Sequence, residues 1–289
     1  MNHLFRPFLF STLTLALPAL LSAAPLQAAP EDESAMFPPI VEVMGPEQEL
    51  FSAIPVESDL RDAVRQVPDF QSCLRRLRSR NPQVQKEAVA DLSNRPGKLR
   101  AVPYLGALFL QADADREVRK AAAMALGRTG DWAALEYLKK GLDDADRGMR
   151  FTTALALGRL RNDGAVSQLE KRSLADADWW TRYAAAVALG QTRNPAAVPA
   201  LKRALSDGEW QVRQQAARSL GEFRSQPARE ALALALKDAD PAVRYAAARA
   251  LGDVGDLDSI EYLRTASSEE TEETAKSSMS AAIRKLVSS

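Results

Sequence analysis

The chain has 289 residues, of which 46% are hydrophobic and 26% charged, an ordinary composition for a folded protein. Lys and Arg together number 38, as do Asp and Glu, which excludes a global basic field that would hold nucleic acid or an anionic membrane. The single cysteine, Cys73, excludes an intramolecular disulfide, and the only histidine is His3.

Residues 1–28 have the three-part pattern of a secretory signal peptide. A short segment with Arg6 precedes an apolar run over residues 8–21, and small residues follow. We expect cleavage near Ala28 and a periplasmic or secreted protein. An uncleaved membrane anchor is the alternative, although a run interrupted by Pro18 is short for a spanning helix of about 20 apolar residues.

Cleavage at this site would leave a mature chain with no membrane span and no histidine. Histidine is the commonest general base and metal ligand, so its absence would exclude Ser-His-Asp triads, Cys-His pairs and histidine metal sites. Residues 29–68 contain several prolines and no clear period, and we interpret them as an N-terminal extension or linker.

A weak helical unit begins at Asp69. Phe70, Cys73, Leu74 and Leu77 share one face of a predicted helix, and a second helix is predicted to begin at Asn81-Pro82. The shared apolar face predicts that Cys73 is a buried core residue rather than a reactive thiol.

Five repeats in register follow this unit. An arginine recurs at steps of 31 or 32 residues, a Leu-Gly pair follows it, and an aspartate precedes it by six residues. The arginines are Arg119, Arg150, Arg182, Arg213 and Arg244, and the aspartates are Asp113, Asp144, Asp176, Asp207 and Asp238. A fixed period of about 20–50 residues indicates a solenoid. We assign the one extra residue, between the second and third copies, to the turn at residues 161–164.

Each repeat reads as two helices. In the last copy, Asp240 is a predicted N-cap, Pro241 suits the first helical position, and Gly252 is predicted to end the helix. A lone hairpin cannot bury both faces, so neighbouring hairpins must stack. The sequence predicts an all-α fold, an α-solenoid of about five to six helical hairpins over residues 69–266, with a capping helix over residues 267–289.

The D-x-x-x-x-x-R spacing followed by V-R-x-x-A-A-x-A-L-G resembles HEAT-like repeats, in the short alanine-rich form of the phycobilisome-lyase type. The resemblance covers residues 98–265. It implies that the second helix of each repeat lines a concave surface, and that the repeat aspartates and arginines form a ladder between repeats.

Paired aspartates such as Asp144 and Asp146 raise the possibility of calcium binding. Calcium needs about six to eight converging oxygens, and no EF-hand or glycine-rich calcium loop is present in the sequence. We predict instead that the second aspartate caps a helix and the first pairs with the repeat arginine. No metal and no cofactor are expected.

The side of the second helix opposite its apolar face is rich in aromatic residues and arginine. These residue types dominate protein interfaces. The candidate binding residues are Arg147, Phe151, Trp179, Tyr183, Trp210, Arg218, Tyr245 and Arg249. The alternative is that Trp179 and Trp210 pack sideways between repeats and only look exposed on an ideal helical wheel.

We therefore predict a non-catalytic scaffold that binds a protein or peptide partner on its concave face. An enzyme or enzyme subunit of the lyase or oxidoreductase HEAT-like families is the alternative. Deoxyhypusine hydroxylases hold a di-iron site on His-Glu motifs, which this sequence lacks, and bilin lyases act in the cytoplasm. HEAT-like DNA glycosylases suggest nucleic-acid binding, against which the zero net charge and the export signal argue. The sequence leaves the oligomeric state open.

Overall fold

The computed structural model describes residues 69–94 and 98–288. The predicted signal peptide and N-terminal extension lie outside these residues. Within the two described ranges, every helix is too short or too polar to cross a membrane.

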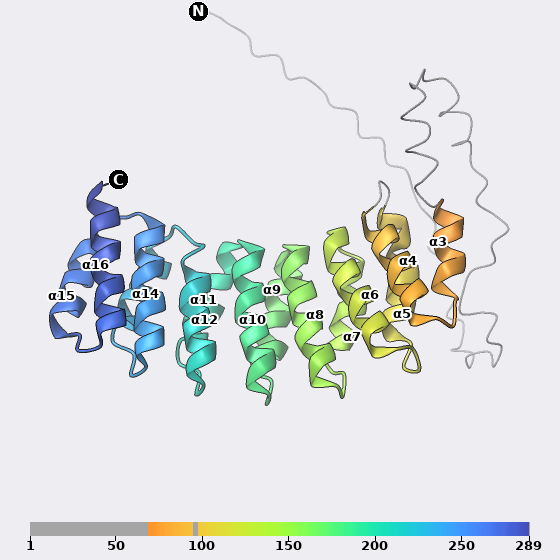
Figure 1. Cartoon of the computed structure of the whole chain (residues 1–289), viewed down its shortest axis with the longest axis horizontal. Helices are drawn as coiled ribbons and strands as arrows, with labels where there is room; N and C mark the ends of the chain where they lie inside the picture. Colours follow the sequence, from red (N-terminus) through yellow and green to blue (C-terminus); the bar gives the residue numbers. More distant parts are fainter. Residues whose placement is uncertain (1–68, 95–97, 289) are drawn as a thin grey trace, which may run out of the picture. The chain divides into compact units, whose positions relative to one another are not determined.

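Fourteen α-helices follow one another in the described ranges, and consecutive helices pair as hairpins (Figure 1). The helices are α3 (Phe70–Leu77), α4 (Pro82–Asn94), α5 (Val102–Leu110), α6 (Arg116–Thr129), α7 (Ala134–Gly141), α8 (Arg147–Leu160), α9 (Asp163–Gln168), α10 (Trp179–Thr192), α11 (Val198–Ala204), α12 (Trp210–Leu220), α13 (Gln226–Ala235), α14 (Pro241–Val254), α15 (Ser259–Glu269) and α16 (Glu273–Ser288). The predicted all-α solenoid of helical hairpins is confirmed. Helix α15 crosses residue 266, where we expected the array to end, so α16 is the second helix of a last hairpin.

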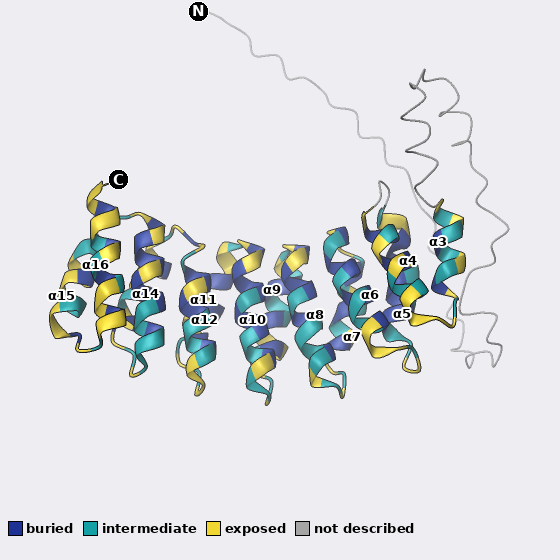
Figure 2. Cartoon of the chain, viewed as in Figure 1, coloured by how far each residue is buried: buried dark blue, intermediate teal, exposed yellow. Residues whose placement is uncertain are grey.

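The even-numbered helices α4 to α16, here called the second helices, form one layer in which each packs on the next (Figure 1). The odd-numbered first helices form the other layer. The Leu of each Leu-Gly pair points between the layers and is fully buried: Leu126, Leu157, Leu189, Leu220 and Leu251. Figure 2 shows this buried side on each second helix. Cys73 is fully buried as well, as predicted.

The glycine lies inside a second helix in four of the five Leu-Gly pairs, whereas Gly221 is the C-cap of α12, and our prediction that Gly252 ends its helix is wrong. Helix α14 continues to Val254 and is capped by Gly255, whose φ is 79°. A Cβ on Gly252 would lie 2.9 Å from the Cβ of Ala282 on α16. The missing side chain therefore lets neighbouring second helices approach closely.

The extra residue of the third copy lies inside a first helix, not in the predicted turn at residues 161–164. Ala165 and Leu169 keep the buried positions of the other repeats, so the insertion comes after Leu169. Residues Leu169–Ser173 form a π-helical turn, η3, in which the Leu174 amide donates to the Leu169 carbonyl oxygen at 2.9 Å. A single inserted residue is absorbed there as a π-bulge.

Aspartates cap four of the second helices, namely α6, α8, α10 and α14. The Asp115 carboxylate accepts hydrogen bonds from the Glu117 and Val118 amides at 2.9 and 3.1 Å. Asp146 and Asp240 accept equivalent first-turn bonds at the start of α8 and α14. Each cap satisfies amides that have no partner within the helix.

The repeat arginines join successive hairpins. Arg182 donates through Nε and Nη2 to the Asp207 carboxylate, at 2.7 and 2.9 Å. Its Nη1 donates to the backbone carbonyl oxygens of Asp176 and Ala177, at 3.0 and 3.1 Å. The equivalent ion pairs are Arg119–Asp144, Arg150–Asp176 and Arg213–Asp238. Arg150, Arg182 and Arg213 thus each fasten their own loop to the next one, whereas Arg119 Nε donates to the Phe109 carbonyl oxygen of α5 at 3.0 Å.

The two ends of the ladder differ from the predicted pattern. Asp113 is exposed and forms no ion pair with a described residue, because the fourth position of α4 holds Gln85 where later second helices hold the ladder arginine. At the other end Arg244 pairs with Glu270, a residue that the aspartate series does not include. Its Nε and Nη2 donate to the Glu270 carboxylate at 2.6 and 2.8 Å.

We expect Glu270 to make folding stability depend on pH. The hydrogen bond from Arg244, aided by the backbone amides of Glu272 and Thr271, lowers its pKa from 4.5 to about 2. A lowered pKa stabilises the fold above pH 4.5, and this stabilisation, about 3 kcal/mol, disappears as the pH falls towards 2. Glu270→Gln should therefore be less stable than the wild type near neutral pH, and the difference should shrink on acidification.

Urea denaturation at a series of pH values measures this difference. Glu269→Gln removes the neighbouring exposed carboxylate and is the matched control, which should show little effect at any pH. If Glu270→Gln lowers the free energy of unfolding equally at all pH values, Glu270 acts through packing rather than through its charge.

Candidate functional site

Three aromatic rings stack across α8 and α10. The rings of Phe151 and Trp180 are 5.2 Å apart at 12°, and those of Trp180 and Tyr183 are 5.4 Å apart at 8°. Trp180 and Tyr183 are three residues apart on α10 and so share a helical face. We call Phe151, Trp180 and Tyr183 the aromatic stack. Trp180, at its centre, remains 43% exposed.

A groove of about 680 Å³ runs beside the aromatic stack at the start of α6, α8 and α10. We call it the aromatic groove; its lining is Arg116, Lys120, Asp146, Arg147, Gly148, Phe151, Thr152, Asp178, Trp179 and Trp180. Trp179 is half-buried and meets the Trp180 ring edge-on at 5.0 Å. Arg147 is exposed and forms no ion pair with a described residue.

The acidic residues of the aromatic groove cap helices. Burial alone would raise the pKa of Asp146, but the Met149 amide and the charges of Arg116 and Lys120 together lower it. Arg116 lies 2.9 Å from the Asp146 carboxylate. Asp146 is thus a charged cap whose lone pairs are already engaged.

A second groove, of about 340 Å³, lies at the other end of α8, α10 and α12, and we call it the arginine groove. Its lining includes Arg161, Arg193, Gln215, Arg218 and Glu222. Glu222 is the one acidic residue among those that line it, and it pairs with Arg193 at 3.3 Å. This groove therefore has an excess of positive charge.

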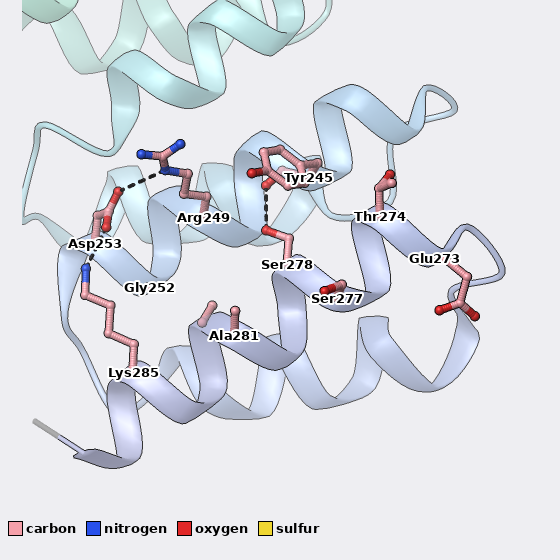
Figure 3. Close-up of a pocket in the computed structure, with 11 residues that line it drawn as sticks. Tyr245, Arg249, Gly252, Asp253, Glu273, Thr274, Ser277, Ser278, Ala281 and Lys285 are labelled. Carbon is pink, nitrogen blue, oxygen red and sulfur yellow. Dashed lines mark hydrogen bonds and ion pairs between the residues drawn. The ribbon is translucent and has the colours of Figure 1, made fainter.

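A third groove separates α14 from α16 and contains the predicted residues Tyr245 and Arg249 (Figure 3). Asp253 lies between the two cations, 3.9 Å from Arg249 and 2.6 Å from Lys285. The Ser278 hydroxyl donates to the Tyr245 carbonyl oxygen at 3.2 Å. With its cations paired to Asp253, this groove offers a ligand less charge than the other two.

The structure places seven of the eight predicted binding residues at these three sites, and Trp210 lines none of the grooves. Arg147, Phe151 and Trp179 line the aromatic groove, and Tyr183 belongs to the aromatic stack. Arg218 lines the arginine groove, and Tyr245 and Arg249 line the third. Trp210 is 40% exposed at the start of α12.

Sequence reasoning missed Trp180, which makes more ring contacts than any predicted aromatic residue. The helical-wheel row passed through Trp179 and left out the tryptophan beside it. The spacing of three between Trp180 and Tyr183 was the available signal. Trp179 meets the ring of its neighbour Trp180 on the same helix.

Within the described ranges, no cluster of three or more His, Cys, Asp or Glu side chains is arranged to hold a metal ion. Of the paired repeat aspartates, all except Asp113 are engaged as helix caps or ladder partners.

Several solved structures resemble this chain. Human deoxyhypusine hydroxylase is 23% identical, with a TM-score of 0.40, 76% of this chain covered and 85% of that one. The CpcE–CpcF complex of phycocyanin lyase from Nostoc is 20% identical, with a TM-score of 0.46, covering 75% and 94%. Kap95p, in a structure with RanGDP, is 14% identical, with a TM-score of 0.53, covering 75% and 36%. Identities this low show the fold alone.

A comparison with curated proteins found no match. The model of the HEAT-repeat family matches this chain four times, over residues 70–150, 108–190, 142–210 and 203–284. These overlapping matches extend over nearly all of the described hairpins, and the chain therefore belongs to the HEAT-repeat family.

Proposed function

We propose that this HEAT-repeat protein is a non-catalytic scaffold that binds a segment of another protein on its second helices. The observation that carries the proposal is the aromatic stack, in which Trp180 is held between two rings yet remains 43% exposed. Such a ring loses little conformational entropy on binding, which is why tryptophan and tyrosine are frequent interface hot spots.

The architecture supports the same proposal. HEAT-type solenoids present extended surfaces that bind partners without any reactive group. Kap95p, with which this chain shares the fold, binds RanGDP. The pattern of residues 1–28 supports a periplasmic or secreted location, and mass spectrometry of the protein from fractionated cells tests it by the presence or loss of these residues.

Crosslinking tests the binding surface. A photoreactive phenylalanine analogue replaces Trp179, so that an aromatic ring still lines the aromatic groove and can crosslink to a bound partner. We expect it to capture one dominant protein, and Trp180→Ala to reduce this capture at least about tenfold, as for a hot-spot tryptophan.

Trp132→Ala is the matched control, because Trp132 is 77% exposed and lies before α7, away from the aromatic groove. This variant should keep full capture. If Trp180→Ala keeps its melting temperature and still captures the partner, the aromatic stack is not the binding surface. If the melting temperature of Trp180→Ala falls, a loss of capture would reflect unfolding rather than a lost contact. Phe151→Leu, which keeps an apolar side chain at the stack, is then the second test.

A further inference from the structure

The chain has no net charge, but its charged residues are distributed unevenly over the helices. Helices α8, α10 and α12 together contain six arginines and no lysine, aspartate or glutamate. Three of these arginines form ion pairs of the ladder: Arg150, Arg182 and Arg213. The other three, Arg147, Arg159 and Arg218, are exposed and form no ion pair with a described residue.

Two of these three free arginines lie at the grooves of the central second helices. Arg147 lines the aromatic groove, beside Trp180. Arg218 lines the arginine groove, where Arg161 adds a further exposed cation. The single glutamate of that groove already pairs with Arg193. A partner that lies along α8, α10 and α12 therefore meets the aromatic stack and Arg147 at one end of these helices, and Arg161 and Arg218 at the other.

We propose that the partner segment is acidic: it places an apolar or aromatic side chain against the aromatic stack and carboxylates against Arg147 and Arg218. This inference rests on the proposed function and specifies its partner. Guanidinium groups pair with carboxylates through two parallel hydrogen bonds, a geometry that lysine does not offer. The absence of acidic residues from these three helices also limits the repulsion of such a segment to the capping aspartates Asp146 and Asp178 and to Glu222 at the groove margins.

The stack favours a protein segment over a nucleic acid. Proteins that bind single-stranded nucleic acids stack bases on open aromatic faces. Phe151 and Tyr183 already stack on the Trp180 ring, at 5.2 and 5.4 Å and within 12° of parallel. A nucleic-acid base would compete with these two rings for the indole, whereas a peptide side chain can contact the stack without displacing them.

Selection of phage-displayed random dodecapeptides on the immobilised full chain tests the inference. We expect enriched peptides to combine several Asp or Glu residues with an aromatic or proline residue. Their affinity, measured by fluorescence anisotropy, should fall at least about tenfold in the double variant Arg147→Gln/Arg218→Gln and should weaken with added salt.

Lys202→Gln/Arg264→Gln is the matched control, since it removes two exposed cations from first helices α11 and α15 and changes the net charge equally. It should leave the affinity unchanged. An equal loss in this control would overturn the inference, because general charge rather than the two grooves would then attract the peptides.

The remaining outcomes separate the two proposals. Enrichment of neutral or basic peptides whose binding needs Trp180 overturns the acidic inference and leaves the scaffold proposal standing. Tighter binding of an oligo-dT strand that is lost in Arg147→Gln/Arg218→Gln overturns the inference in favour of nucleic acid. No enrichment of any peptide contradicts the proposed function itself.

Discussion

Arg182→Ala is expected to lower the free energy of unfolding by about 3 kcal/mol, the range seen when one partner of a buried ion pair is removed. The Arg182 and Asp207 side chains are only 18% and 10% exposed. The substitution leaves the Asp207 carboxylate without its guanidinium partner and removes the donor to the Asp176 carbonyl oxygen. The loss therefore combines two broken contacts with an uncompensated charge.

Urea denaturation followed by far-UV circular dichroism measures this loss. Arg203→Ala is the matched control, because Arg203 also pairs between repeats, with Glu170, but the two side chains are 59% and 38% exposed. Exposed pairs contribute about 0–1 kcal/mol, so this variant should be nearly as stable as the wild type. Similar stabilities of the two variants would show that the ladder ion pair stabilises the fold no more than an exposed ion pair does.

Gly127→Ala is expected to destabilise the protein by about 2 kcal/mol, although helix propensity alone predicts a gain of about 1 kcal/mol. A Cβ at Gly127 on α6 would lie 2.4 Å from the carbonyl oxygen and 2.9 Å from the Cα of Ala156 on α8. These are backbone atoms, so the clash cannot be relieved by rotating a side chain. The two second helices must instead move apart, which disturbs the packing of neighbouring hairpins.

Gly208→Ala is the matched control for this prediction. Gly208 lies in the loop before α12, and an added Cβ would meet nothing within 4 Å. We expect the free energy of unfolding to change by no more than about 0.5 kcal/mol. The change is stabilising if the lower conformational entropy that alanine gives the unfolded chain dominates. A more stable Gly127→Ala variant would mean that helix propensity outweighs packing, and that the second helices tolerate a wider spacing.

The sequence alone determined the hairpin repeat, its period and the aspartate N-caps. These features depend on local order: an aspartate before Val118 or Val243 caps whichever helix follows it, and apolar residues at spacings of three and four build one buried face. The fully buried leucines of the Leu-Gly pairs and the buried Cys73 follow from this periodicity.

Only the tertiary structure decided the features that depend on distances between helices. The role of Gly127 and its equivalents follows from the separation of neighbouring helix axes, which no pattern within one helix specifies. Glu270 ends the ladder because its carboxylate reaches Arg244, although it breaks the aspartate series. Trp180 became the centre of the site because Phe151, on another helix, lies within stacking distance of its ring. Local spacing encodes the helices, whereas the contacts between helices fix which exposed side chains gather into a surface.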